Sequence, residues 1–96
     1  MPELKKYKMF IGGEWVDSDT KKTFETLNPE DNKPWAVVPE ASANDVDKAV
    51  KAAQKAFEGD WPKILPRERA KFLRAIGNKL RDNAELLGKI ETIDTG

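Results

Sequence analysis

The sequence has 96 residues, which is enough for one domain at most. Lysine plus arginine equals aspartate plus glutamate at 17 each, so the chain has no net charge to attract nucleic acid or an anionic membrane surface. It contains no cysteine and no histidine, which excludes a thiol nucleophile, an imidazole base and the common zinc sites within these residues.

The start of the sequence shows no targeting signal. Residues 1–8 are mostly charged and polar, unlike the apolar core of a signal peptide, and we predict that they form a solvated N-terminal arm. No apolar run approaches the length of about 18 residues that spans a bilayer. Because the absence of cysteine also fits a reducing compartment, we expect a cytoplasmic protein without membrane or nucleic-acid partners.

A hairpin is predicted at the start of the folded region. Residues 9–11 and 14–16 are rich in β-formers, and they flank Gly12 and Gly13. Two consecutive glycines suit the positive φ values of a tight turn between antiparallel strands.

Two further short strands follow. Residues 23–27 alternate in polarity, and Asn28-Pro29 ends this strand because proline lacks a donor N–H. Residues 35–38 form the next strand, which Pro39 ends. The first half of the chain is therefore predicted to be a small antiparallel arrangement.

The second half carries helical signals. Ser42 and Asp45 have the spacing of a capping box, and Gly59 ends the first helix. Pro66 suits the first turn of a second helix, and Asn83 is the predicted N-cap of a third. Each helix has one apolar face, made respectively by Val46, Val50, Ala53 and Phe57, by Ala70, Leu73, Ile76 and Leu80, and by Leu86, Leu87, Ile90 and Ile93.

Few side chains in the sequence are candidates for a catalytic or ligand-binding role. The three tryptophans, Trp15, Trp35 and Trp61, are interpreted as packing residues rather than ligand platforms. Glu85 and Glu91 lie six positions apart on different helix faces, so they do not form an acid–base pair. The glycine spacing offers no phosphate-binding loop.

Several segments together carry a resemblance to a known family. They are FIGGEWVDS at 10–18, TFETLNP at 23–29, DVDKAVKAAQKAF at 45–57, Trp61, PRERAKFL at 66–73 and ELLGKIETIDTG at 85–96. In this order and spacing they resemble the N-terminal segment of the aldehyde dehydrogenase superfamily over residues 9–96. The resemblance implies an α/β fold for the family. It makes this α+β segment, short antiparallel strands followed by three helices, the outer part of a Rossmann-like cofactor-binding domain.

The resemblance also implies a function. Such enzymes oxidise an aldehyde to a carboxylic acid with NAD or NADP, through a thiohemiacetal on a cysteine and a water activated by a glutamate. The family's catalytic and cofactor-binding residues match no position of this sequence, so none is assigned and the 96 residues alone are expected to be inactive. We expect an aldehyde substrate and a homo-oligomer, either a dimer or a tetramer.

The segment KIETIDTG at 89–96 resembles a helix that leads into further chain. We therefore expect this sequence to be part of a longer enzyme, with apolar faces that pack against polypeptide outside it. The alternative is a free-standing structural or interaction module related to the same segment.

One family site matches positions in this sequence. Many members hold a structural monovalent cation, Na⁺ or K⁺, with oxygens of a dipeptide at a strand end and of an acidic residue after the third helix. The matching positions are Thr26, Leu27 and Asp94. Hard cations prefer such oxygen ligands. The alternative is that Thr26 only completes a strand and Asp94 only caps a helix end.

Overall fold

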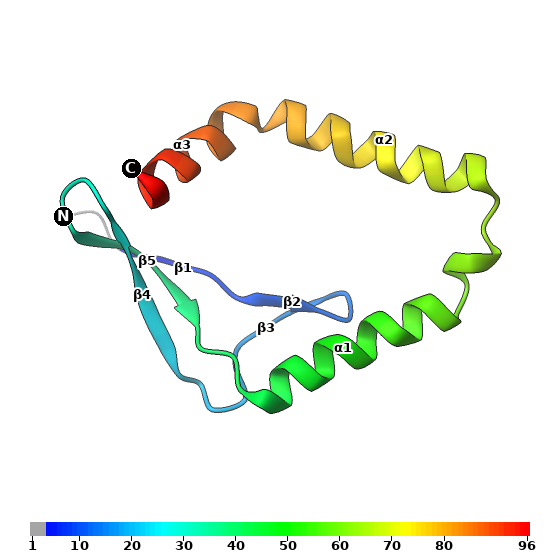
Figure 1. Cartoon of the computed structure of the whole chain (residues 1–96), viewed down its shortest axis with the longest axis horizontal. Helices are drawn as coiled ribbons and strands as arrows, with labels where there is room; N and C mark the ends of the chain where they lie inside the picture. Colours follow the sequence, from blue (N-terminus) through cyan, green and yellow to red (C-terminus); the bar gives the residue numbers. More distant parts are fainter. Residues whose placement is uncertain (1–3) are drawn as a thin grey trace.

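The structure is a computed structural model that describes residues 4–96. Five strands precede three α-helices and a short 3₁₀ helix (Figure 1). In chain order they are β1 (Lys5–Lys6), β2 (Met9–Ile11), β3 (Glu14–Val16), β4 (Thr23–Asn28), β5 (Lys33–Pro39), α1 (Ala43–Glu58), η1 (Trp61–Lys63), α2 (Pro66–Asp82) and α3 (Ala84–Thr95).

The strands form two small sheets. β2 and β3 make the predicted hairpin, in which Gly12 and Gly13 have φ of 61° and 83°. In the second sheet the strand order is β1-β5-β4, with β4 antiparallel and β1 parallel to β5. The antiparallel prediction is therefore confirmed for two pairs, and β1 adds a parallel pair that the sequence analysis missed.

The predicted N-terminal arm needs correction. Of its eight residues, 1–3 lie outside the described part of the chain. Lys5 and Lys6 are exposed, as expected of an arm, but they pair with Ala36 and Val37 of β5 and are therefore strand. Charged side chains at the edge of a sheet reduce pairing with other chains, which fits their place in the outermost strand.

The helix ends follow the predicted signals with one exception. Ser42 and Asp45 form the capping box of α1, and Pro66 opens α2. Asn83, however, makes no side-chain cap for α3. Its amide group instead donates to the main-chain oxygen of Lys79 at 2.8 Å, so the side chain ends α2.

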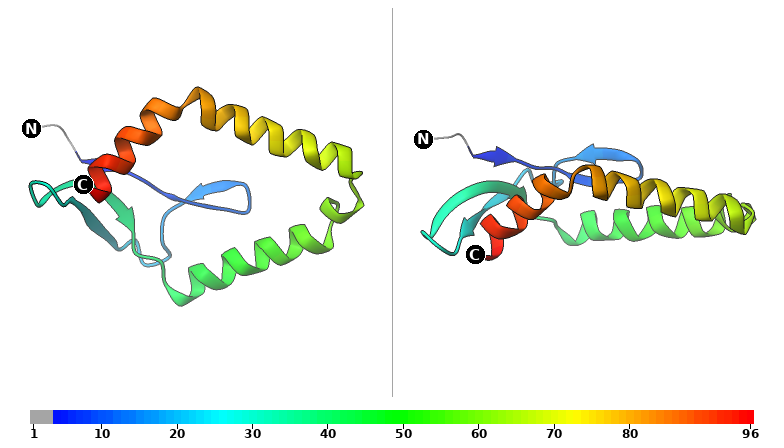
Figure 2. Two further views of the ribbon diagram at one scale, coloured as in Figure 1. Left: turned by 45° about the horizontal axis from the view of Figure 1, so that its top comes forward. Right: turned by 90° about the horizontal axis from the view of Figure 1, so that it is seen from above.

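The elements enclose little core. The radius of gyration is 16.9 Å, whereas a compact domain of this length would have about 12.5 Å. α1 and α2 run along opposite sides of an open arrangement, and the molecule is thin in the right view of Figure 2, with a smallest extent of 18 Å. Among the described residues, Ala36 is the one fully buried apolar side chain.

The apolar helix faces remain exposed in this chain. Six large side chains on the predicted faces of α1 and α2 are more than half exposed: Val46, Val50, Phe57, Leu73, Ile76 and Leu80. Within residues 4–96 no helix is both long and apolar enough to cross a membrane. Monomeric proteins in water rarely expose apolar faces of this size.

A buried carboxylate connects α1 to the loop before β4. Asp45 is 4% exposed and accepts hydrogen bonds from the main-chain N–H of Ser42 at 2.9 Å and from the Ser42 hydroxyl at 3.1 Å. Both carboxylate oxygens also accept from the N–H of Asp19 at 3.2 Å. The N–H of Ser42 contributes most to holding the pKa of Asp45 below its ordinary value, while burial acts in the opposite direction.

We predict that the 96-residue polypeptide on its own is partly unfolded or self-associated. Ordering a chain of this size costs about 100 kcal/mol or more in conformational entropy, and the chain buries too little apolar surface to offset it. Calorimetry combined with sedimentation measures this. A sharp cooperative melt of a monomeric sample would contradict the prediction.

We also predict that Asp45→Asn destabilises the protein at neutral pH and that the difference shrinks in acid. A carboxylate whose pKa is lower in the folded state stabilises fully above its unfolded pKa of about 4, and this stabilisation is lost as the pH falls through the folded value. Urea unfolding of the whole protein, with and without the substitution, over a range of pH measures the difference.

Asp47→Asn is the matched control for this experiment. Asp47 lies on the same helix, but it forms an exposed pair with Lys51 at 2.9 Å. Exposed pairs of this kind contribute little, so its effect should be small at every pH. A loss for Asp45→Asn that does not change with pH would show that the carboxylate charge is not the cause.

Candidate functional site

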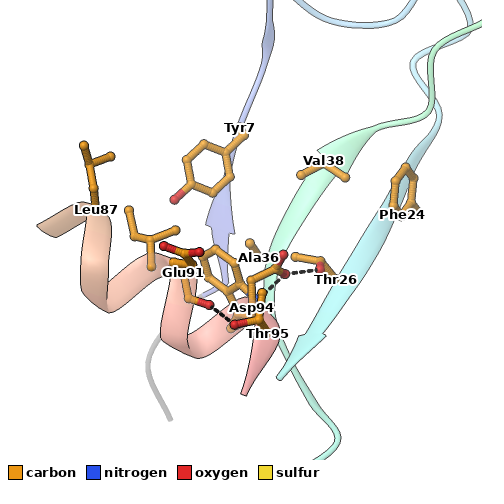
Figure 3. A pocket seen from close by; sticks show the side chains of 11 residues that line it. Tyr7, Phe24, Thr26, Ala36, Val38, Leu87, Glu91, Asp94 and Thr95 are labelled. Carbon is orange, nitrogen blue, oxygen red and sulfur yellow. Dashed lines mark hydrogen bonds between the residues drawn. The ribbon is translucent and has the colours of Figure 1, made fainter. Parts of the chain in front are cut away.

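A groove lies between the β1-β5-β4 sheet and α3 (Figure 3). Its volume is about 460 Å³, and its walls come from the segment after β1, from both longer strands and from the last turns of α3. The lining residues are Tyr7, Phe24, Thr26, Trp35, Ala36, Val38, Leu87, Ile90, Glu91, Asp94 and Thr95.

The structure brings two of the three predicted cation ligands together. The hydroxyl of Thr26 donates to Asp94 Oδ1 at 2.8 Å, although the two residues lie 68 positions apart in the sequence. Figure 3 shows this contact between β4 and α3. Leu27 is the next residue of β4 and does not line the groove. Because a leucine side chain has no oxygen, only the main-chain oxygen of Leu27 is a candidate ligand.

The strand register is irregular at this position. Thr26 pairs with Ala36, but Leu27 pairs with Pro34, so Trp35 is left without a partner in β4. Such a bulge redirects side chains and interrupts the regular ladder of main-chain hydrogen bonds. The bulge also accommodates Pro34, which has no N–H to donate to a neighbouring strand.

Trp35, which the sequence analysis interpreted as a packing residue, also makes a polar contact in the groove. Its indole Nε1–H donates to Asp94 Oδ1 at 3.3 Å, the same oxygen that accepts from Thr26. No described residue donates to Asp94 Oδ2. Pro34 directly precedes the strand predicted at residues 35–38, and the structure includes it in β5 beside the bulge. Proline within a strand is typical of a bulge. The hydrogen bond from Trp35 to Asp94 also requires α3 to pack against the sheet.

The end of α3 concentrates negative charge. Glu91 and Asp94 are three positions apart on one face, and the last turn carries no basic residue. The C-terminal end of a helix has a partial negative charge, which two carboxylates increase. The hydroxyl of Thr95 donates to the main-chain oxygen of Glu91 at 2.7 Å. This hydrogen bond leaves both carboxylates of the last turns charged. A cation in the groove would therefore be favoured electrostatically.

The groove also contains one unsatisfied polar atom. The hydroxyl oxygen of Tyr7 is buried and has no hydrogen-bond partner within residues 4–96. Its ring lies against that of Trp35 at 6.2 Å with an interplanar angle of 75°. The groove thus combines an aromatic wall with several oxygens, and no cysteine or histidine is among the described residues that line it.

Sequence comparisons find one family. A family model described as the aldehyde dehydrogenase family matches residues 15–96. An aldehyde dehydrogenase of Aspergillus niger is 46% identical over 88 residues, which cover 92% of this chain and 18% of that protein.

Solved structures share the backbone arrangement. The NAD-dependent aldehyde dehydrogenase from Sinorhizobium meliloti matches with a TM-score of 0.93 and 33% identity, over 98% of this chain and 19% of that chain. The NAD⁺ complex of an aldehyde dehydrogenase from Bacillus cereus matches with a TM-score of 0.92 and 42% identity, over 96% of this chain and 19% of that one. This chain spans less than a fifth of the length of these relatives.

Proposed function

Since this chain belongs to the aldehyde dehydrogenase family, we propose that it is part of an enzyme that oxidises an aldehyde to a carboxylic acid with NAD or NADP. The observation that supports this most strongly is the TM-score of 0.93 with an NAD-dependent relative over 98% of the chain. An open arrangement with little core of its own matches these larger enzymes in backbone, and such agreement is unexpected for an unrelated small module.

The role of these residues within that enzyme is structural. The chain has no cysteine to act as the nucleophile and no nucleotide-binding loop, so the chemistry belongs to other residues of the whole protein. We propose that residues 9–96 form the outer part of the cofactor-binding domain. The exposed faces of α1 and α2 then pack against the remaining polypeptide, which makes up most of the length of the relatives.

The free-standing interaction module is the less favoured alternative. A module that folds alone needs a core, whereas this chain has a radius of gyration of 16.9 Å and one fully buried apolar residue among those described.

We propose further that the whole protein is a cytoplasmic homo-oligomer, a dimer or tetramer, that acts on a small aldehyde. The family resemblance supports the oligomer and the aldehyde substrate, and the absence of cysteine supports the cytoplasmic location.

We also propose that Thr26, Leu27 and Asp94 hold a structural monovalent cation, Na⁺ or K⁺. Asp94 and Thr26 supply adjacent oxygens at 2.8 Å, and the bulge beside Leu27 leaves main-chain oxygens as candidate ligands. Within residues 4–96 no three acidic, cysteine or histidine side chains come close enough to hold a metal ion. A site with few carboxylates suits a single positive charge.

The enzymatic proposal predicts a division of activity. The whole protein should reduce NAD or NADP in the presence of an aldehyde, whereas residues 1–96 alone should show neither turnover nor saturable binding of the cofactor. Absorbance of the reduced nicotinamide and titration calorimetry measure the two quantities. Saturable NAD binding by the isolated chain would contradict our assignment of cofactor contacts to other residues.

The cation proposal predicts salt-specific stabilisation of the whole protein. A ligand that binds only the folded state stabilises it by about 2.7 kcal/mol at a hundred times its Kd. K⁺ or Na⁺ should therefore raise the melting temperature relative to N-methylglucamine at equal ionic strength, and Asp94→Asn should remove this increase. Glu85→Gln, in the first turn of α3, is the matched control. An equal response in both variants would exclude Asp94 as a ligand.

A further inference from the structure

We propose that Trp35 is a positioning residue for the carboxylate of Asp94 and that its indole responds to the bound cation. This inference rests on the cation site proposed above. The indole N–H and the Thr26 hydroxyl both donate to Asp94 Oδ1, at 3.3 and 2.8 Å. Two donors on one oxygen fix the rotation of the carboxylate and leave Oδ2 to a cation.

The bulge in β5 directs Trp35 to this position. In a regular strand, consecutive side chains point to opposite faces of the sheet. Ala36 lines the groove, so Trp35 would ordinarily point away from it, yet both residues line the groove. The extra residue at the bulge places two neighbouring side chains on the same face.

A second contact holds the indole in place. Tyr7 meets the Trp35 ring edge to face, with ring centroids 6.2 Å apart. The main-chain N–H of Tyr7 donates to the oxygen of Val37 at 3.0 Å, which fixes Tyr7 to β5. Trp35 is therefore supported by the sheet on one side and hydrogen-bonded to α3 on the other.

The competing role for Trp35 is packing alone. A packing residue tolerates replacement by another aromatic ring without a change in cation affinity. A positioning residue does not, because partners that orient a metal ligand typically change metal affinity by about tenfold or more when they are replaced. The indole N–H is the atom that separates the two roles.

The test uses the whole protein labelled with 5-fluorotryptophan. The Trp35 fluorine resonance is assigned by its absence in Trp35→Phe, and the protein is titrated with KCl, NaCl or N-methylglucamine chloride. We expect this resonance to shift saturably with K⁺ or Na⁺ but not with N-methylglucamine, and we expect Asp94→Asn to abolish the shift. Trp35→Phe should weaken the K⁺ midpoint of thermal stabilisation by about tenfold.

Two variants make the result specific. Trp61→Phe is the control, because Trp61 packs on Phe72 at 5.8 Å and does not line the groove, and its K⁺ midpoint should not change. A benzothienylalanine at position 35 keeps the ring shape and lacks the N–H. It should behave as Trp35→Phe does, and it replaces that variant if Trp35→Phe does not fold.

The outcomes separate this inference from the site itself. If Asp94→Asn removes the K⁺ response but both changes at position 35 keep the original midpoint, Trp35 only packs and the inference is wrong, while the cation site stands. If the unsubstituted protein shows no saturable response to K⁺ or Na⁺, the cation site and the inference are both wrong.

Discussion

The contact between the end of α3 and the β4–β5 pair closes the chain on itself. α1 and α2 extend away from the larger sheet (Figure 1). The chain returns to the sheet where Thr26 donates to Asp94 (Figure 3). Trp35 donates to the same carboxylate. The return is polar at Asp94 and apolar where Leu87 and Ile90 face the sheet. The groove forms because α3 returns to the sheet. The same return brings the oxygens of Thr26 and Asp94 together.

Hydrogen bonds fix the two ends of the helical half, whereas little apolar packing holds the part between them. Asp45 fixes the start of the helical half to the loop before β4, and Asp94 fixes its end to the sheet. Between these points, the apolar faces of α1 and α2 remain exposed. The same backbone recurs in relatives about five times as long, in which additional polypeptide is available to cover such faces.

Local signals predicted most of the elements, because they act within a few residues. The glycine pair, the Ser42–Asp45 box and Pro66 each determined a turn or a helix start. Asn83 is the N-cap residue of α3, as predicted, but its side chain caps α2 instead, because an amide can donate to the helix that precedes it. The pairing of Thr26 with Asp94 was inferred from a family resemblance, whereas the place of Trp35 was missed because a register shift cannot be read from alternation alone.

The 68-residue separation of Thr26 from Asp94 has a consequence for synthesis on the ribosome. At translation rates of about 5–20 residues per second, roughly 3–14 seconds pass between the two codons. The strand pair therefore emerges with Phe24 and Val38 uncovered well before α3 exists. During that interval the nascent chain presents an apolar sheet face without the helix that later forms the other wall of the groove.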